Sequence, residues 1–200
     1  MDNSTFKKYM EIFLRENSKL NLISKNDEKY LYEKHIFDSL AIKKFFEKYD
    51  ISDFVGMHLL DIGTGGGFPA VPIAIQYPKL QVTALDSIRK KINVISEIKE
   101  ELGLDNLNTI CNRAENLKNI KFNFITSRAV ASLEKLIPYA IPLLDRNGYF
   151  IAYKSVKTQE EVKEAQQILK KSSAKVIDII EYNLPLKENY TRNLIIIKKS

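Results

Sequence analysis

Hydrophobic residues first recur at helical spacing over residues 5–17, and a second stripe of the same kind follows over residues 28–49. Asn26 or Asp27 stands where the second helix needs a capping side chain. Because these two helices precede every other element, we expect residues 1–56 to form a helical N-terminal cap.

The pattern changes at residue 57, from which short apolar runs alternate with amphipathic segments. The apolar runs predict seven strands, at residues 59–62, 80–86, 107–111, 122–126, 148–153, 176–182 and 193–197. The segments between them predict four helices, at residues 68–76, 87–102, 131–144 and 158–171. Pro138 and Pro142 are expected to interrupt the third helix. Such alternation implies an α/β domain over residues 57–200, with a mostly parallel seven-stranded sheet, helices on both faces and an antiparallel last strand.

The composition is that of an ordinary globular chain, with 44% hydrophobic and 28% charged residues. No apolar run approaches the roughly 18 residues of a membrane helix, and the first residues lack the features of a signal peptide. We therefore expect a cytoplasmic protein, and a monomer, since no long apolar stripe is left over. The single cysteine, Cys111, is expected to be a buried, inert thiol. One cysteine and two histidines offer no zinc-site spacing, so no metal is expected.

The net charge of +6 is unevenly distributed along the chain. Residues 1–56 hold ten basic and ten acidic residues, whereas residues 57–200 hold twenty-one against fifteen. A basic domain favours a polyanionic partner such as RNA, because attraction to phosphates supplies most sequence-independent affinity for nucleic acids. A generally basic proteome would give the same excess, so charge alone leaves the partner open.

A glycine-rich turn, residues 63–67, follows the first predicted strand and opens the next helix. This is the context that a nucleotide-binding turn requires. Glycines reach backbone angles that other residues avoid, and they let the main chain approach a ligand closely. In open α/β sheets ligands lie beyond the carboxyl ends of the strands, so this turn faces the expected site.

The spacing of the turn separates two kinds of nucleotide ligand. A dinucleotide site needs a third glycine where this chain has Phe68. S-adenosylmethionine carries a sulfonium and an ammonium instead of a pyrophosphate, and Asp61 just before the turn suits these cations better. Asp86, which ends the second strand, is placed to accept hydrogen bonds from ribose hydroxyls. These features favour an S-adenosylmethionine-dependent methyltransferase over a nicotinamide or flavin enzyme, and over a turn with no ligand.

Two later segments follow strands that should border the same crevice. Ala114 and Glu115 come after the third strand, where a loop could contact the adenine edge. Arg128 comes after the fourth strand, which in a sheet of this order adjoins the first. We expect Arg128 to project into the crevice, with a structural salt bridge as the alternative.

Together these segments resemble the ribosomal RNA small-subunit methyltransferase G family, also called glucose-inhibited division protein B. The matching stretches are Asn21–Ile23, His35–Leu40, Asp61–Pro69, Leu85–Ser87, Arg89–Lys91, Ser127–Ala129 and Arg192–Leu194. They run in order over most of the chain, and the His-x-x-Asp-Ser-Leu segment is more specific than the glycine turn. Ala70, where the family often has glycine, and Phe68, where it often has leucine, are departures at the level of packing.

The resemblance implies a Rossmann-like class I fold and methyl transfer to N7 of a guanine in 16S ribosomal RNA, alone or within an assembling small subunit. The turn and the resemblance together indicate these cofactor-site positions: Gly63, Thr64, Gly65, Gly67, Phe68, Asp86, Ser87, Ala114, Glu115 and Arg128. Guanine N7 has a free lone pair and no proton, so its methylation needs no general base. Catalysis would then depend on positioning, for which Arg128 is the candidate, and on exclusion of water.

Five further residues are candidates for RNA contacts: His35, Arg89, Lys90, Lys91 and Lys154. Lys154, at a strand end like Arg128, could hold the target or its phosphates, and the three consecutive basic residues could add backbone contacts. A solvated basic helix face is the alternative for those three. His35 lies on an apolar helical stripe, which favours a structural role with Asp38 over a hydrogen bond in the site.

Two other functions are compatible with the same pattern. The absence of a large substrate domain permits a methyltransferase acting on a small molecule or a protein, although the basic second part of the chain argues against it. A non-catalytic RNA-binding module with a vestigial fold is the second, although the intact glycines and Asp86 argue against it.

Overall fold

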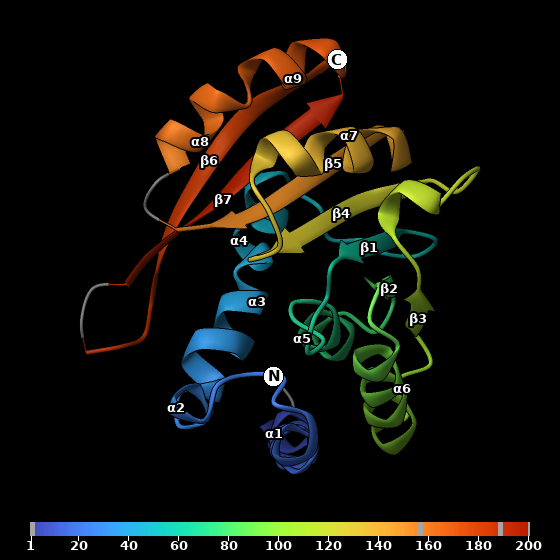
Figure 1. Cartoon of the computed structure of the whole chain (residues 1–200), viewed down its shortest axis with the longest axis vertical. Coiled ribbons are helices and arrows are strands. Elements are labelled where there is room, and N and C mark those ends of the chain that lie inside the picture. Colours follow the sequence, from blue (N-terminus) through green and yellow to red (C-terminus); the bar gives the residue numbers. More distant parts are fainter. Residues whose placement is uncertain (1–2, 156–157, 188–189, 200) are drawn as a thin grey trace.

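The computed structural model describes residues 3–155, 158–187 and 190–199, and a seven-stranded sheet crosses its centre (Figure 1). The strands follow the order β3-β2-β1-β4-β5-β7-β6. They are β1 His58–Ile62, β2 Gln81–Asp86, β3 Leu107–Cys111, β4 Phe122–Arg128, β5 Leu144–Lys154, β6 Ala174–Leu184 and β7 Tyr190–Lys199. Among these strands β7 alone runs opposite in direction to the rest, and it pairs antiparallel with β5 and β6. The predicted α/β class, with its single antiparallel last strand, is confirmed.

The helices of residues 57–200 lie on both faces of the sheet, and four shorter helices follow the long N-terminal one. They are α1 Asn3–Leu20, α2 Lys25–Glu28, η1 Leu31–Phe37, α3 Asp38–Leu40, α4 Ile42–Lys48, α5 Ala70–Gln76, α6 Arg89–Leu102, η2 Ala114–Asn116, α7 Leu133–Leu143, α8 Thr158–Glu164 and α9 Gln166–Lys171. The positive φ of Gly103, +65°, ends α6 in the left-handed conformation that this position favours.

The single helix predicted over residues 28–49 is wrong, because that segment is divided between α2, η1, α3 and α4. Ser24, and neither Asn26 nor Asp27, provides the cap, by accepting a hydrogen bond from the Asp27 amide. The middle piece, η1, is a π-helix. Side chains from the sheet bind its backbone region: Arg128 donates to the Lys34 carbonyl, and Tyr153 donates to the Ser39 carbonyl just after η1. Such competing donors disturb a regular helical ladder.

Three smaller expectations are also wrong. The helix α7 continues through Pro138 and Pro142 without a break, and its buried apolar face against the sheet explains why it tolerates them. Cys111 is half-buried, not buried, because it lies at the end of β3. The predicted helix over 158–171 is divided at Ala165 into α8 and α9.

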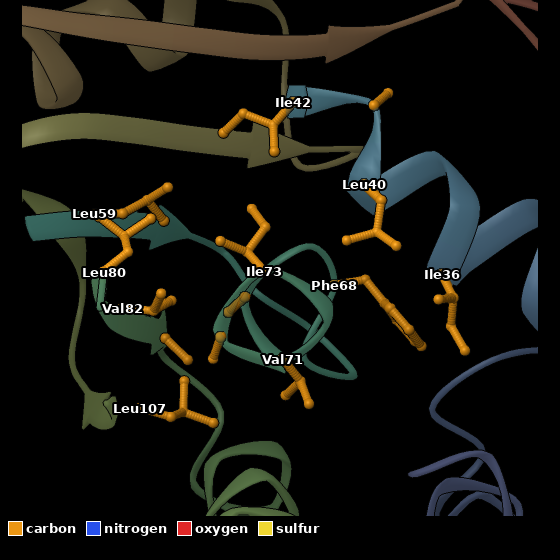
Figure 2. Close-up of a cluster of buried hydrophobic side chains, with 14 of the residues drawn as sticks. Ile36, Leu40, Ile42, Leu59, Phe68, Val71, Ile73, Leu80, Val82 and Leu107 are labelled. Atoms are coloured by element: carbon orange, nitrogen blue, oxygen red, sulfur yellow. The ribbon is translucent and has the colours of Figure 1, made fainter. Parts of the chain in front are cut away.

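The N-terminal helices share one apolar core with the sheet. Figure 2 shows Ile36 and Leu40 beside Phe68, and the same cluster continues to Leu59 and Val82 in the strands. A second core lies under α7, α8 and α9 on the opposite face. The division into a cap of residues 1–56 and a domain of residues 57–200 stays a proposal. None of the described helices is both long and apolar enough to cross a membrane.

Candidate active site

A cavity of about 620 Å³ opens where β1, β2 and β4 end. Nine of the ten predicted cofactor positions line it: Gly63, Thr64, Gly65, Phe68, Asp86, Ser87, Ala114, Glu115 and Arg128. His35 and Lys91 line it as well. We call it the cofactor cavity.

The glycine turn is tied to the neighbouring strand by its backbone. The amides of Gly63 and Thr64 both donate to the Leu85 carbonyl, at 2.8 and 2.9 Å. Gly63 has φ +70°, and a Cβ there would lie 2.5 Å from a methyl carbon of Val130. Both the backbone angle and the space therefore require glycine at this position.

Gly67 is the one predicted cofactor position that does not line the cavity. Its φ is +92°, and a Cβ would lie 2.7 Å from the side chain of Val71 in α5. Gly67 is therefore needed for close packing of the turn against the start of α5. Gly66, which was not predicted, lines the cavity instead.

Asp86 anchors the loop that faces the turn. One carboxylate oxygen accepts from the Gly65 amide at 3.0 Å, and the other accepts from the Ile88 amide at 2.9 Å. Asp86 also lines the cavity. Each carboxylate oxygen has a further lone pair, so the side chain can hold the turn and still accept from a ligand hydroxyl.

Asp61 lies beneath the turn and, contrary to expectation, does not line the cavity. Its side chain is fully buried and accepts a hydrogen bond from Thr126 at 2.9 Å. Burial raises the pKa of Asp61 to about 6, although the nearby Thr64, the hydrogen bond from Thr126 and the charge of Arg128 oppose the rise. Asp61 therefore joins β1 to β4 next to the turn.

Arg128, at the end of β4, has several partners and still lines the cavity. Its Nη1 donates to an oxygen of Asp38 at 2.9 Å and to the Lys34 carbonyl at 3.1 Å, and its Nη2 donates to His35 at 3.0 Å. Its guanidinium carbon lies 5.2 Å from the centre of the Phe68 ring. The structural salt bridge and the place in the crevice are thus both present.

The expected structural role of His35 with Asp38 is mediated by Arg128. The side chains of His35 and Asp38 each form a hydrogen bond with its guanidinium. A guanidinium only donates, so the His35 Nδ1 accepts and the ring proton lies on Nε2. Burial, with a smaller effect from the charge of Arg128, lowers the pKa of His35 to about 4. The ring is therefore neutral at physiological pH.

A second cavity, of about 500 Å³, shares His35, Arg128 and Ala129 with the cofactor cavity. Lys154 lines it, but its ammonium is bound to Glu161 at 2.6 Å and to the Ala131 carbonyl at 2.7 Å. The side chain that was expected to hold RNA phosphates is thus already paired.

The remaining predicted basic residues lie at the start of α6. Arg89 and Lys90 are exposed and line neither of these two cavities, whereas Lys91 reaches the cofactor cavity. The loop after β4 was missed: Ala129, Val130 and Ala131 all line the cofactor cavity. Ala129 has φ +55°, a strained angle that nothing in its residue type signals.

The cofactor cavity fits the chemistry of S-adenosylmethionine. Its size falls within the range of roughly 300–1,000 Å³ that small-molecule sites occupy. Glycines without side chains form one wall, and the Asp86 carboxylate provides an acceptor for ribose hydroxyls.

Comparison with known proteins gives a family match over nearly the whole chain. The model of the rRNA small subunit methyltransferase G family (GidB) matches residues 2–195. The ribosomal RNA small subunit methyltransferase G of Lysinibacillus sphaericus is 37% identical over 92% of this chain and 77% of its own length. The protein of the same name from Staphylococcus epidermidis is 38% identical over 97% of this chain and 80% of its own.

Solved structures agree at the level of the fold. An S-adenosylmethionine-dependent methyltransferase from Clostridium acetobutylicum superposes with a TM-score of 0.63 at 15% identity, covering 88% of this chain and 98% of the other. The ribosomal protein L11 methylase of Lactobacillus delbrueckii gives 0.58 at 17% identity, covering 82% and 77%.

Proposed function

The chain belongs to the rRNA small subunit methyltransferase G family, and from this premise we propose that it methylates N7 of a guanine in 16S ribosomal RNA. It is an enzyme, an S-adenosylmethionine-dependent rRNA methyltransferase, in keeping with its relatives. The observation that carries the finer proposal is the shared wall of the two cavities, where Arg128 and a neutral His35 separate the cofactor cavity from a second opening.

The cofactor cavity would hold S-adenosylmethionine through the groups already described. When bound, the cofactor supplies an electrophilic methyl group on its sulfonium. Asp86 would accept from the ribose hydroxyls, and the loop at Ala114 and Glu115 would contact the adenine edge. The backbone of Gly63 and Gly65 would border the methionine part, where a side chain would obstruct it.

The state of His35 supports chemistry without a general base. Its Nδ1 is engaged by Arg128, and its Nε2 carries the ring proton, so neither nitrogen can take a proton while that contact lasts. A guanine N7 has no proton to lose, so its methylation needs no general base. An acceptor such as an exocyclic amine would need a base that His35 does not provide.

Arg128 would then act by position. Four contacts, to Asp38, His35, the Lys34 carbonyl and the face of Phe68, hold its guanidinium at the boundary of both cavities. A fixed cation at this place can orient an anionic or carbonyl group of either ligand. Its contribution would be to align the acceptor with the methyl group and to exclude water.

We also propose that the protein is a cytoplasmic monomer that meets its RNA alone or in an assembling subunit. The large hydrophobic side chains exposed on the described surface are mostly scattered along the chain, among them Leu20, Val55 and Ile120. Scattered residues of this kind are ordinary on a monomer.

Transfer of a tritiated methyl group to 16S RNA from cells lacking this gene tests the proposal. The RNA should accept label at one guanine, and cleavage chemistry specific for 7-methylguanine should locate it. Free nucleosides and protein extract serve as controls for the alternative substrates. Label in those fractions but not in the RNA, or label at another atom of the base, would contradict the proposal.

A further inference from the structure

The second cavity has a rim that combines aromatic rings with cations. Four residues form what we call the tyrosine rim: Tyr30, Lys34, Tyr190 and Arg192. Lys34, Tyr190 and Arg192 line the cavity directly. They come from opposite ends of the chain, which meet because β6 packs against η1, and Figure 1 shows the β6–β7 hairpin reaching beyond the sheet beside the N-terminal helices.

The rings of the rim are accessible and lie close to the positive charges. The Lys34 ammonium is 5.0 Å from the centre of the Tyr30 ring and 6.0 Å from that of Tyr190. The guanidinium carbon of Arg192 is 6.0 Å from the Tyr190 ring. Tyr30 is 36% and Tyr190 43% exposed, so a ligand can reach both rings.

The charges of the second cavity leave one cation in excess. Its three carboxylates are each paired within the described part of the chain: Asp27 with Lys34 at 2.7 Å, Asp38 with Arg128 at 2.9 Å and Glu161 with Lys154 at 2.6 Å. Its remaining cation is Arg192.

Arg192 has no ion pair among the described residues, and its buried Nε has no hydrogen-bond partner there. A buried donor without a partner costs free energy, so this position favours a ligand with acceptor oxygens. A phosphate provides such oxygens together with the missing negative charge.

We propose that the second cavity and its tyrosine rim bind an unpaired stretch of the substrate RNA, with a base stacked on Tyr190 and a phosphate on Arg192. Exposed aromatic rings beside cations are the means by which proteins hold single strands. The proposal rests on the function proposed above, because guanine N7 in paired A-form RNA faces a deep, narrow groove that side chains cannot enter. An unpaired nucleotide can instead reach the wall at Arg128 from this side.

The test uses the full chain and four variants: Tyr190→Ala, Tyr190→Phe, Arg192→Ala and, as the matched control, Tyr32→Ala. Tyr32 is an equally exposed tyrosine of η1, 39% exposed, that lines neither cavity. Binding of a fluorescent single-stranded oligoribonucleotide is measured beside the same sequence in a duplex. Calorimetry with S-adenosylmethionine and thermal melting show whether each variant retains its fold and its cofactor site.

Tyr190→Ala should weaken single-strand binding by roughly fivefold or more, the range expected for loss of one stacked base. Tyr190→Phe should retain it, because the ring remains. Arg192→Ala should weaken binding and reduce its dependence on salt, since one phosphate contact is lost. The KM for RNA should rise in both alanine variants while cofactor affinity stays unchanged.

The proposal is overturned if both alanine variants, folded and binding cofactor, bind the single strand as tightly as Tyr32→Ala does. It is also overturned if the wild-type chain binds the duplex as well as the single strand. If the rim variants lose single-strand binding but the wild type labels no guanine N7, the rim stands and only the proposed function fails. If the wild type labels guanine N7 and the variants match the control, this inference alone fails.

Discussion

The cofactor cavity is held together mainly by backbone groups, whereas the second cavity is held together by charged side chains. In the first, amides of the glycine turn donate to the Leu85 carbonyl and to the Asp86 carboxylate. In the second, ion pairs join Asp38 to Arg128 and Glu161 to Lys154. A cavity held by backbone hydrogen bonds tolerates most side-chain substitutions. A cavity held by ion pairs loses a contact whenever one charged partner is replaced.

One carboxylate from each cavity illustrates the difference. Asp86 accepts hydrogen bonds from two backbone amides, that of Gly65 in the glycine turn and that of Ile88 in the loop after β2. Asp38 accepts from Arg128 at 2.9 Å and from the Tyr182 hydroxyl at 2.6 Å, side chains of β4 and β6. Loss of Asp86 should therefore loosen one loop, whereas loss of Asp38 should loosen the contact between the N-terminal helices and the sheet.

The largest effect is expected from Asp38→Ala. Removing one partner of a buried ion pair leaves the other charge uncompensated and destabilises a fold by roughly 3–5 kcal/mol. Chemical denaturation measures this loss. Affinity for S-adenosylmethionine in the remaining folded protein should change by less than about threefold, because the backbone contacts of the cofactor cavity persist.

Asp38→Asn is the matched control, since an amide oxygen can still accept from Tyr182. It should lose less stability than Asp38→Ala. A fall in cofactor affinity as large as the fall in RNA methylation would show that the two cavities are not separable.

The pH dependence of stability should differ in sign between the two regions. His35 has a pKa of about 4 in the folded chain and a higher one, 6.5, when unfolded, so its contribution to stability falls as the pH drops from 6.5 to 4. Asp61 has a pKa of about 6 in the folded chain and 3.8 when unfolded, so its contribution falls as the pH rises from 3.8 to 6. Each amounts to about 3 kcal/mol.

The variants His35→Asn and Asp61→Asn should each remove one of these two slopes. Melting temperatures of the wild type and both variants at pH 4, 5, 6 and 7 provide the measurement. If Asp61→Asn became less stable relative to the wild type as the pH rose, the burial argument for Asp61 would be wrong.

Gly63→Ala should affect the cofactor cavity alone. A non-glycine residue at φ +70° costs about 1–2 kcal/mol, and the new Cβ would also displace Val130 at the cavity wall. We expect cofactor affinity measured by calorimetry to fall by about tenfold or more, with single-strand RNA binding unchanged.

Gly56→Ala is the control for the backbone cost. Gly56 has a similar φ of +72°, but a Cβ there meets nothing within 4 Å. Equal loss of cofactor affinity in both variants would mean that the space at Gly63 is irrelevant.

The smallest effect is expected from Lys154→Gln. Its ammonium is already bound to Glu161 and to the Ala131 carbonyl, so it has little to offer a phosphate. The KM for RNA should change by less than about threefold. If the KM for RNA rose as much as in Arg192→Ala, Lys154 would contact the RNA, as the sequence suggested.

The sequence alone determined the strands, their mostly parallel arrangement and the place of the cofactor turn. Each of these depends on local signals: the period of apolar residues, glycines next to a strand, and an acid at a strand end. Asp86 and Arg128 were found because each stands at the end of a strand, and parallel strands bring their carboxyl ends to one edge.

Only the tertiary structure decided what the polar side chains do there. Arg128 meets His35 and Asp38 across 93 and 90 positions of the chain, and Tyr182 meets Asp38 across 144. The state of His35, the division of the second predicted helix, the pairing of Lys154 and the tyrosine rim all follow from such contacts. No spacing in a sequence encodes them, because they arise only when sheet order and helix packing bring the two ends of the chain together.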